Sequence, residues 1–355
     1  MSLSALLHLF DFEMKNKEYI TDFDQLYDSM MKCKKGVSWK PSVKSFVLND
    51  LENIHRMERQ LKNGTWKNGT PRPIKITYPK KRDGLSISFK DRVYQRSIND
   101  NVLYPATTKS FVYDNWACQT GKGPDKAREQ VKNMLWKFYQ KYGADGCVLQ
   151  TDIKGYYPNM SHRAVKDSFK EYLDEESHEM VCDILDAQYK GDVGYNPGSQ
   201  MVQIAGITLL NPVDHYIKEK LHEKYYVRYM DDGWILEHDK EKLEQNLILI
   251  ENKLKECGCT LNRKKTKITH LSKGFVFLGF RYTISDTGKI TMKIVSENVR
   301  HERRKLRKMV EKSKQGVIPK EKVDECYSSW RNHASKGNDK KTVPKMDKYY
   351  ESLWR

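Results

Sequence analysis

The sequence predicts an α+β fold in which helices alternate with short hairpins. Apolar residues recur at helical spacing over residues 22–65, 124–142 and 240–258. Two other stretches, 73–89 and 225–237, are rich in β-branched and aromatic residues, and each is interrupted once by turn-forming or acidic residues. Hairpins set between helical segments are typical of this fold class.

The composition indicates a polyanionic partner. The 355 residues include 64 Lys and Arg against 47 Asp and Glu, a formal net charge of +17, which favours nucleic acid. No run approaches the roughly 18 apolar residues of a membrane helix, and the N-terminus lacks the basic start of a signal peptide. Seven scattered cysteines without a C-x-x-C pair speak against a zinc finger. We therefore expect a folded cytoplasmic protein that does not bind a membrane.

The elements follow one another in a simple order. Asp83-Gly84 is a hairpin turn signal within 73–89, and the neighbouring residues Lys75, Lys80, Lys81 and Arg82 make this hairpin basic. A short apolar strand begins at Cys147 and ends at Asp152, and the hairpin over 225–237 has its two acids at the turn. The other expected elements are helices at 90–105, 162–190 and 202–222 and strands within 274–294.

The C-terminal part of the chain is helical and basic. Residues 290–355 contain 18 Lys and Arg against nine Asp and Glu, about half of the excess charge. Four arginines recur along its first helical pattern: Arg300, Arg303, Arg304 and Arg307. Such a stretch is either a solvated helix face or a surface that binds the phosphates along a nucleic acid strand, and the concentration of charge favours the nucleic-acid-binding surface.

Three carboxylates stand at strand ends or turns, where they can meet. Asp231-Asp232 interrupts two strand-like runs, in which Asp is disfavoured, and Asp152 closes another strand. Three converging carboxylates can hold two Mg²⁺ ions for phosphoryl transfer. Acids at such positions also serve as turn or cap residues, so the pattern alone leaves both interpretations open.

The residues around these acids resemble reverse transcriptases. The segment RYMDDGWIL around Asp231-Asp232 and the segment LQTDIKGYYPNM around Asp152 are similar to the catalytic motifs of that family. The resemblance continues in three further ordered segments: PKKRDG followed by FKDRVYQR, LNRKKT at 261–266, and FVFLGFRY at 275–282. It implies a right-hand polymerase with fingers at 1–110, palm at 111–289 and a helical thumb at 290–355.

The resemblance also implies roles in catalysis. Asp152, Asp231, Asp232 and the Ile153 carbonyl would hold two Mg²⁺ ions, with Mn²⁺ as an alternative. Lys265 would protonate the leaving pyrophosphate. Tyr157 would exclude the 2′-hydroxyl of a ribonucleotide. Further contacts to the incoming dNTP would come from Lys80, Lys81, Arg82, Gly198 and Gln203.

Other positions would hold nucleic acid, namely the RNA template and the DNA primer or cDNA. Arg92 and Gln95 would contact the template or brace the fingers, and helical packing explains them equally well. Gly279 would support the primer strand. The duplex would lie on Arg300, Arg303, Arg304 and Arg307.

One segment, 194–203, points to a subtype. GYNPGSQMVQ resembles the pattern of diversity-generating retroelement enzymes, with two departures at Pro197 and Val202. That group implies a bacterial or phage-encoded enzyme with a small basic accessory protein. The end of the chain, without an endonuclease, RNase H or cysteine-rich domain, favours a compact enzyme that relies on a partner protein or a structured RNA. The alternatives are a phage-defence reverse transcriptase that uses a non-coding RNA, a group II intron-like maturase, and an RNA-binding protein with an inactive polymerase fold.

Overall fold

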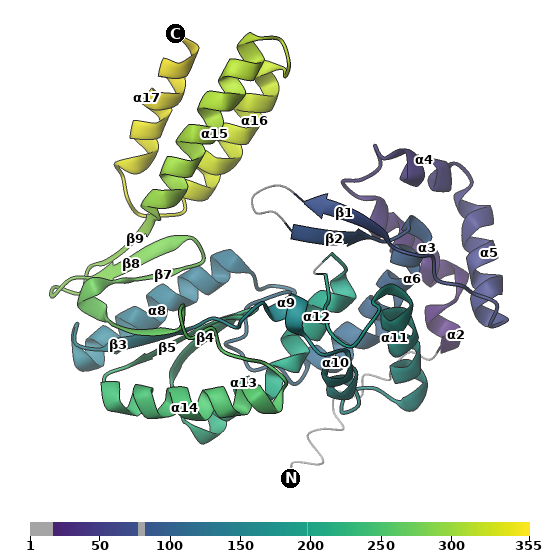
Figure 1. Cartoon of the computed structure of the whole chain (residues 1–355), viewed down its shortest axis with the longest axis horizontal. Helices are drawn as coiled ribbons and strands as arrows, with labels where there is room; N and C mark the ends of the chain where they lie inside the picture. Colours follow the sequence, from purple (N-terminus) through teal and green to yellow (C-terminus); the bar gives the residue numbers. More distant parts are fainter. Residues whose placement is uncertain (1–16, 77–81, 197) are drawn as a thin grey trace. The chain divides into compact units, whose positions relative to one another are not determined.

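The computed structural model describes residues 17–76, 82–196 and 198–355 (Figure 1). In these ranges the predicted α+β class is confirmed, because helices are combined with antiparallel sheets of two, four and three strands. The chain divides into two compact units. The first comprises Met1–Gly121, Asp152–His222 and Leu249–Asn262, and the second Lys122–Thr151, Glu223–Ile248 and Arg263–Arg355. None of the described helices combines the length and apolarity needed to cross a bilayer.

The first unit is mostly helical. Its helices include α2 (Lys17–Ile20), α3 (Phe23–Lys34), α4 (Pro41–Leu48), α5 (Asp50–Lys62), α6 (Phe89–Ile98), η2 (Asn99–Leu103), α7 (Tyr104–Thr108), α9 (Tyr156–Asn159), α10 (His162–Phe169), α11 (Glu175–Gln188), α12 (Gln200–Leu209), α13 (Asn211–His215) and η3 (Tyr216–Lys220). The helical pattern over 22–65 is thus three helices. Pro41 stands in the first turn of α4, where its missing N–H costs no hydrogen bond.

The basic hairpin forms, but its turn is not where the sequence predicted it. Strand β1 (Arg72–Ile76) pairs with β2 (Arg82–Ser86) in the register Ile74↔Gly84 and Lys75↔Asp83. The predicted turn at Asp83-Gly84 is therefore wrong, because both residues lie inside β2. Gly84 lies against the side chains of Ile74 and Ile76, and a Cβ there would approach both to 3.2 Å. The glycine therefore gives room to its cross-strand neighbours, and the connection falls at residues 77–81, outside the described ranges.

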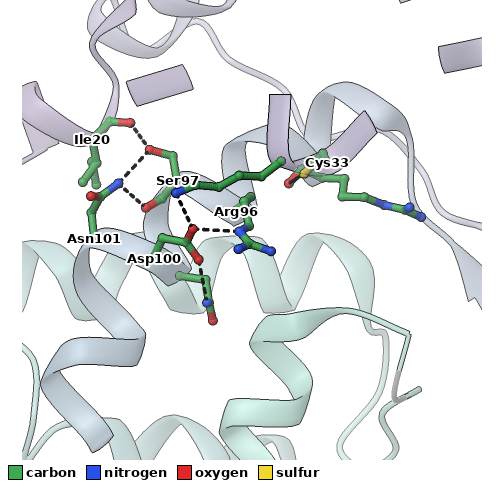
Figure 2. Close-up of polar contacts among 9 residues, drawn as sticks. Ile20, Cys33, Arg96, Ser97, Asp100 and Asn101 are labelled. Atoms are coloured by element: carbon green, nitrogen blue, oxygen red, sulfur yellow. Dashed lines mark hydrogen bonds and ion pairs between the residues drawn. The ribbon is translucent and has the colours of Figure 1, made fainter. Parts of the chain in front are cut away.

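Helix α6 is held to α3 and to the end of α2 by polar contacts (Figure 2). Ser97 Oγ donates to the Ile20 carbonyl over 2.6 Å, and both residues are buried. Asp100 accepts hydrogen bonds from Lys32 Nζ (3.0 Å) and Arg96 Nε (2.8 Å). One carboxylate thus bridges a cation of α3 and a cation of α6, which gives α6 a defined position on the N-terminal helices.

The second unit contains a four-stranded antiparallel sheet in the order β4-β5-β3-β6. The strands are β3 (Cys147–Thr151), β4 (Tyr225–Tyr229), β5 (Asp232–Glu237) and β6 (Lys267–His270). The unit also contains α8 (Pro124–Tyr142) and the first half of α14 (Lys240–Glu256). The sheet interior is fully buried at Val148, Leu149, Val227, Trp234 and Leu236. Strand β6 was not predicted, because its sequence KITH has no apolar alternation that stands out.

The rest of the second unit is a three-stranded sheet and a helical bundle. The sheet contains β7 (Phe275–Phe277), β8 (Phe280–Ile284) and β9 (Ile290–Ile294) and follows the short helix η4 (Leu271–Lys273). The bundle consists of α15 (Ser296–Lys314), α16 (Lys320–Ala334) and α17 (Thr342–Trp354). Its core contains the buried residues Leu306, Val310, Val323, Tyr327 and Met346. A helical C-terminal segment was predicted, although its assignment as a thumb remains a prediction.

Candidate functional site: a two-carboxylate hairpin turn and its neighbours

The two adjacent acids stand at a tight turn, as the sequence predicted. Strands β4 and β5 pair up to Tyr229↔Asp232, which leaves Met230 and Asp231 as the connection. Met230 has a positive φ of 55°, a conformation that costs a non-glycine residue of the order of 1 kcal/mol. Buried Arg228 donates through Nη1 to the Met230 carbonyl over 2.9 Å. This hydrogen bond helps to hold the strained turn that presents Asp231 and Asp232.

Strand β5 continues from these acids alongside β3. Thr151, the last residue of β3, pairs with Gly233, the residue after Asp232. A Cβ at Gly233 would overlap Thr151 Oγ1, so the close approach of the two strands requires glycine here. Asp152 follows Thr151 directly in the chain. Asp152 thus directly follows one member of the Thr151–Gly233 pair, and Asp232 directly precedes the other.

Asp152 itself lies in the first unit, where the segment at 261–262 orients it. Asn262 Nδ2 donates to Asp152 Oδ1 over 2.8 Å, and the Asn262 N–H donates to the Asp152 carbonyl over 2.7 Å. Next to it, Ile153 forms an isolated antiparallel bridge with Leu261, and both residues are buried. The sequence singled out Lys265 in LNRKKT and missed Asn262. No local signal in the motif marks Asn262, because its partner Asp152 lies 110 residues away in the chain.

Tyr157 lies on α9, packed beside α12. The hydroxyl of its neighbour Tyr156 donates to the Gly206 carbonyl, and the Tyr195 N–H donates to the Tyr157 carbonyl over 2.8 Å. A Cβ at Gly206 would lie 3.2 Å from the Tyr157 hydroxyl. Gly206, which the sequence did not single out, therefore leaves the space that the Tyr157 ring uses.

Three predicted contact residues line one pocket of about 240 Å³ in the first unit. They are Arg92 and Gln95 of α6 and Gly198, just before α12. Gln95 is 5% exposed, and its amide nitrogen has no hydrogen-bond partner among the described residues. Cys33 also lines the pocket, and burial raises the pKa of its thiol to about 11, so the thiol is protonated at neutral pH. The structure thus brings together residues that the sequence assigned to template and to substrate separately.

The start of α12 contains three other positions of the subtype motif, Ser199, Val202 and Gln203. Ser199 is its N-cap, with Oγ accepting from the Val202 N–H over 3.2 Å. Val202 is fully buried, so a valine in place of the usual serine fits the interior. Gln203 faces Cys118, whose Sγ donates to Gln203 Oε1 over 3.8 Å. Its predicted contact with the incoming nucleotide stays a prediction.

Four predicted positions are described only in part or not at all. Lys80, Lys81 and Pro197 lie outside the described residues. Arg82 begins β2 opposite Ile76, and its side chain is likewise outside the description. The prediction that Lys80, Lys81 and Arg82 contact the triphosphate of the incoming dNTP therefore rests on the sequence alone.

Lys265 and Gly279 lie in the second unit. Lys265 is exposed in the segment before β6. Gly279 and Leu278 form the two-residue turn between β7 and β8, with φ of 83° and 46°, as in hairpin turns that match the strand twist. A Cβ at Gly279 would lie 3.5 Å from His333 Nε2 of α16. Burial, followed by the nearby charges of Arg128 and Lys336, lowers the pKa of His333, so the imidazole beside this turn favours its neutral form.

The four arginines of α15 are exposed, but one is also part of the bundle. Arg303 Nε donates to Met346 Sδ over 3.3 Å, and its guanidinium lies 4.9 Å from the ring centroid of Tyr349. Arg300 and Arg303 line a pocket of about 540 Å³ together with Arg281, Lys293 and Lys345. Glu297 and Asp339 line the same pocket, so five cations and two acids share it at the foot of the bundle. Binding of nucleic acid by Arg300, Arg303, Arg304 and Arg307 stays a prediction.

The described residues contain no group of three or more His, Cys, Asp and Glu arranged to hold a metal ion. The predicted set of Asp152, Ile153, Asp231 and Asp232 therefore stays a prediction. Its chemistry suits Mg²⁺ or Mn²⁺, because all of the donors are carboxylate or carbonyl oxygens.

The fold and the motif order define a polymerase-like α+β protein, and a family comparison agrees. Residues 87–282, more than half of the chain, match the family described as reverse transcriptase (RNA-dependent DNA polymerase). The chain belongs to this family, an enzyme family of nucleotidyltransferases. The match covers the turn at Met230-Asp231, Asp152, the 261–266 motif and the turn at Gly279.

Solved structures of telomerases are among those similar to this chain. Apo telomerase from Candida tropicalis is 13% identical, with a TM-score of 0.46, over 64% of this chain and 49% of that chain. Telomerase from Candida albicans with a TWJ fragment of telomeric RNA is 13% identical, with a TM-score of 0.49, over 80% and 54% of the respective chains. The present chain thus spans about half the length of these telomerase chains. No curated protein sequence matches it.

Proposed function

We propose that this chain is an RNA-directed DNA polymerase that extends a DNA primer on an RNA template with dNTPs. The observation that carries the proposal is the register of β3, β5 and β4. It brings Thr151 opposite Gly233 and puts Asp231 in a two-residue turn. Asp232 lies at the end of this paired region, and Asp152 and Asp231 directly adjoin it in the chain, inside a segment that matches the reverse transcriptase family.

In this proposal, Asp152, Asp231, Asp232 and the Ile153 carbonyl hold Mg²⁺, or alternatively Mn²⁺. The bound ions supply charge neutralisation for the triphosphate and favour ionisation of the primer hydroxyl. Asn262 keeps the Asp152 carboxylate in place, and Arg228 keeps the turn closed. Lys265 donates a proton to the leaving pyrophosphate, and Tyr157 excludes the 2′-hydroxyl. The N-terminal helices and β1–β2 act as fingers, and α15–α17 act as a thumb on the duplex.

The finer proposal is a diversity-generating retroelement enzyme with a small basic accessory protein. It is supported by Gly194, Gly198, Ser199 and Gln203, which match the pattern of that group. The neighbouring genes test it. Paired template and variable repeats beside the gene would support it, whereas a defence operon with a non-coding RNA would overturn it.

The activity is tested with poly(rA)/oligo(dT), Mg²⁺ and dTTP. We expect incorporation by the wild type and its loss, by about a thousandfold or more, in Asp231→Asn, with RNA binding retained. Asp286→Asn is the matched control, because Asp286 is an exposed acid at another hairpin connection of the same unit. Absence of incorporation by the wild type, or equal activity of Asp231→Asn and the control, would overturn the proposal.

A further inference from the structure

One pocket of the first unit lies at the base of the β1–β2 hairpin. Its volume is about 720 Å³, within the range typical of small-ligand sites. It is lined by parts of α4, α5, β1, β2 and the start of α6, which lie together in the purple and blue part of Figure 1. Most of its walls precede residue 87, where the match to the family begins. None of the residues predicted for catalysis lines it.

The charged residues that line this pocket are all cations, and the buried Asp91 carboxylate lies behind its wall. Arg56, Arg72 and Lys90 line it, and no carboxylate is among the described lining residues. Arg56 donates to Asn53, which is neutral. Three cations without a lining acid favour an anionic ligand, and guanidinium groups suit phosphate oxygens.

The pocket also offers aromatic surface. Phe46, Trp66 and Phe89 line it, and the rings of Phe46 and Phe89 meet edge to face with centroids 5.2 Å apart. Trp66 is held by its indole N–H, which donates to Asn68 over 3.1 Å. Lys90 Nζ lies 4.8 Å from the Trp66 ring centroid. Aromatic rings beside cations are the combination with which proteins bind unpaired nucleotides.

Buried hydrogen bonds hold the floor of the pocket in shape. Asp91, which is fully buried, accepts from the Gly69 N–H over 3.0 Å and from Ser88 Oγ over 2.6 Å. Gly69 and Ser88 both line the pocket. A Cβ at Gly69 would come within 2.8 Å of the Asp91 carboxylate, so the close contact requires glycine. These contacts fix the backbone at Gly69 and the side chain of Ser88, two parts of the pocket wall.

We infer that this pocket binds an unpaired nucleotide of an RNA strand, with the base against Phe46 and Trp66 and the phosphates against Arg56 and Arg72. The anionic and aromatic character of the ligand follows from the pocket itself. The choice of RNA rests on the proposed function.

The test measures binding of a fluorescein-labelled, unstructured 12-nucleotide RNA to the full chain by anisotropy at several salt concentrations. We expect Trp66→Leu to weaken binding about fivefold or more, because a stacking surface is lost. Arg56→Gln with Arg72→Gln should weaken binding and lower the slope of log K against log salt by roughly 0.7 per removed cation. Trp66→Phe should restore most of the affinity that Trp66→Leu loses.

Two control variants remove the same chemistry outside the pocket. Arg59→Gln removes an exposed cation of α5, and Trp39→Leu removes an indole that is 70% exposed; neither residue lines the pocket. Pocket variants that bind RNA as these controls do would overturn the inference. Equal, pocket-dependent binding of a poly-glutamate peptide or of free dTTP would overturn RNA as the ligand. Failure of the proposed function would give a different result: DNA synthesis would be absent, while the differences in RNA binding between the pocket variants and the controls would remain.

Discussion

The side-chain amide of Asn262 donates a hydrogen bond of 2.8 Å to the carboxylate of Asp152. The backbone N–H of Asn262 also donates to the Asp152 carbonyl, over 2.7 Å. Two segments 110 residues apart in the chain are thereby joined at a predicted metal-binding acid. Asn262 is a positioning residue in this arrangement, because it acts through Asp152 and not on the substrate.

We therefore expect Asn262→Ala to lower kcat on poly(rA)/oligo(dT) by about tenfold to a hundredfold, since a hydrogen bond to a charged group is worth about 1.5–3 kcal/mol. KM for dTTP should change little. Steady-state kinetics measure kcat and KM separately. Asn101→Ala is the control, because this amide donates to the Ser97 carbonyl over 2.9 Å, on α6 and η2. An unchanged kcat, or a loss matched by an equal loss of folded protein, would contradict the positioning role.

Asn262 also marks a limit of the sequence as a guide. The acids, the strand-like runs around them and the basic C-terminal helices could be predicted, because charge and periodicity are local properties. The residue that donates a hydrogen bond to the Asp152 carboxylate could not be predicted, because the pairing of Asn262 with Asp152 depends on how distant segments of the chain meet. Similarly, Asp83-Gly84 has the composition of a turn, but the space between Ile74 and Ile76 decides that Gly84 lies inside a strand.

The pairing of Thr151 with Gly233 gives a second prediction. Gly233→Ala would put its Cβ against Thr151 Oγ1. We expect destabilisation of about 1–3 kcal/mol, as for other overpacked sites. Adding Thr151→Ala should recover part of this loss, because it removes the colliding oxygen. Urea unfolding of the two single variants and the double variant measures the coupling between them. Strictly additive effects would show that the two side chains do not collide.

Tyr157 gives a third prediction, which concerns the sugar of the substrate. Tyr157→Ala should admit ribonucleotides and lower the ratio of kcat/KM for dTTP over UTP by about tenfold or more, because the excluding ring is gone. Tyr157→Phe is the matched control, since it keeps the bulk of the ring and loses only the hydroxyl. It should retain the selectivity of the wild type. The same ratio in Tyr157→Ala and in the wild type would remove Tyr157 from sugar selection.

The helical bundle gives a fourth prediction, which depends on pH. The hydrogen bond from Arg331, helped by one from Tyr327, holds the pKa of Asp347 below its ordinary value of 3.8. A carboxyl whose pKa is lower in the folded state stabilises the fold above the unfolded pKa and loses this effect as the pH falls through the folded value. The contact joins α16 to α17 at a partly exposed position, so its contribution is small.

Asp347→Asn should accordingly lower the thermal midpoint of the full chain by about 1–2 °C at pH 7. The same difference should persist at pH 5, because Asp347 is still ionised in both states. Below about pH 4 it should shrink, since the wild-type carboxyl then becomes protonated as well. Differential scanning fluorimetry across this range measures the effect, and Glu351→Gln, an exposed acid of α17, is the control. A difference that grows as the pH falls would mean that the carboxylate destabilises the bundle, opposite to the role that its contacts with Arg331 and Tyr327 indicate.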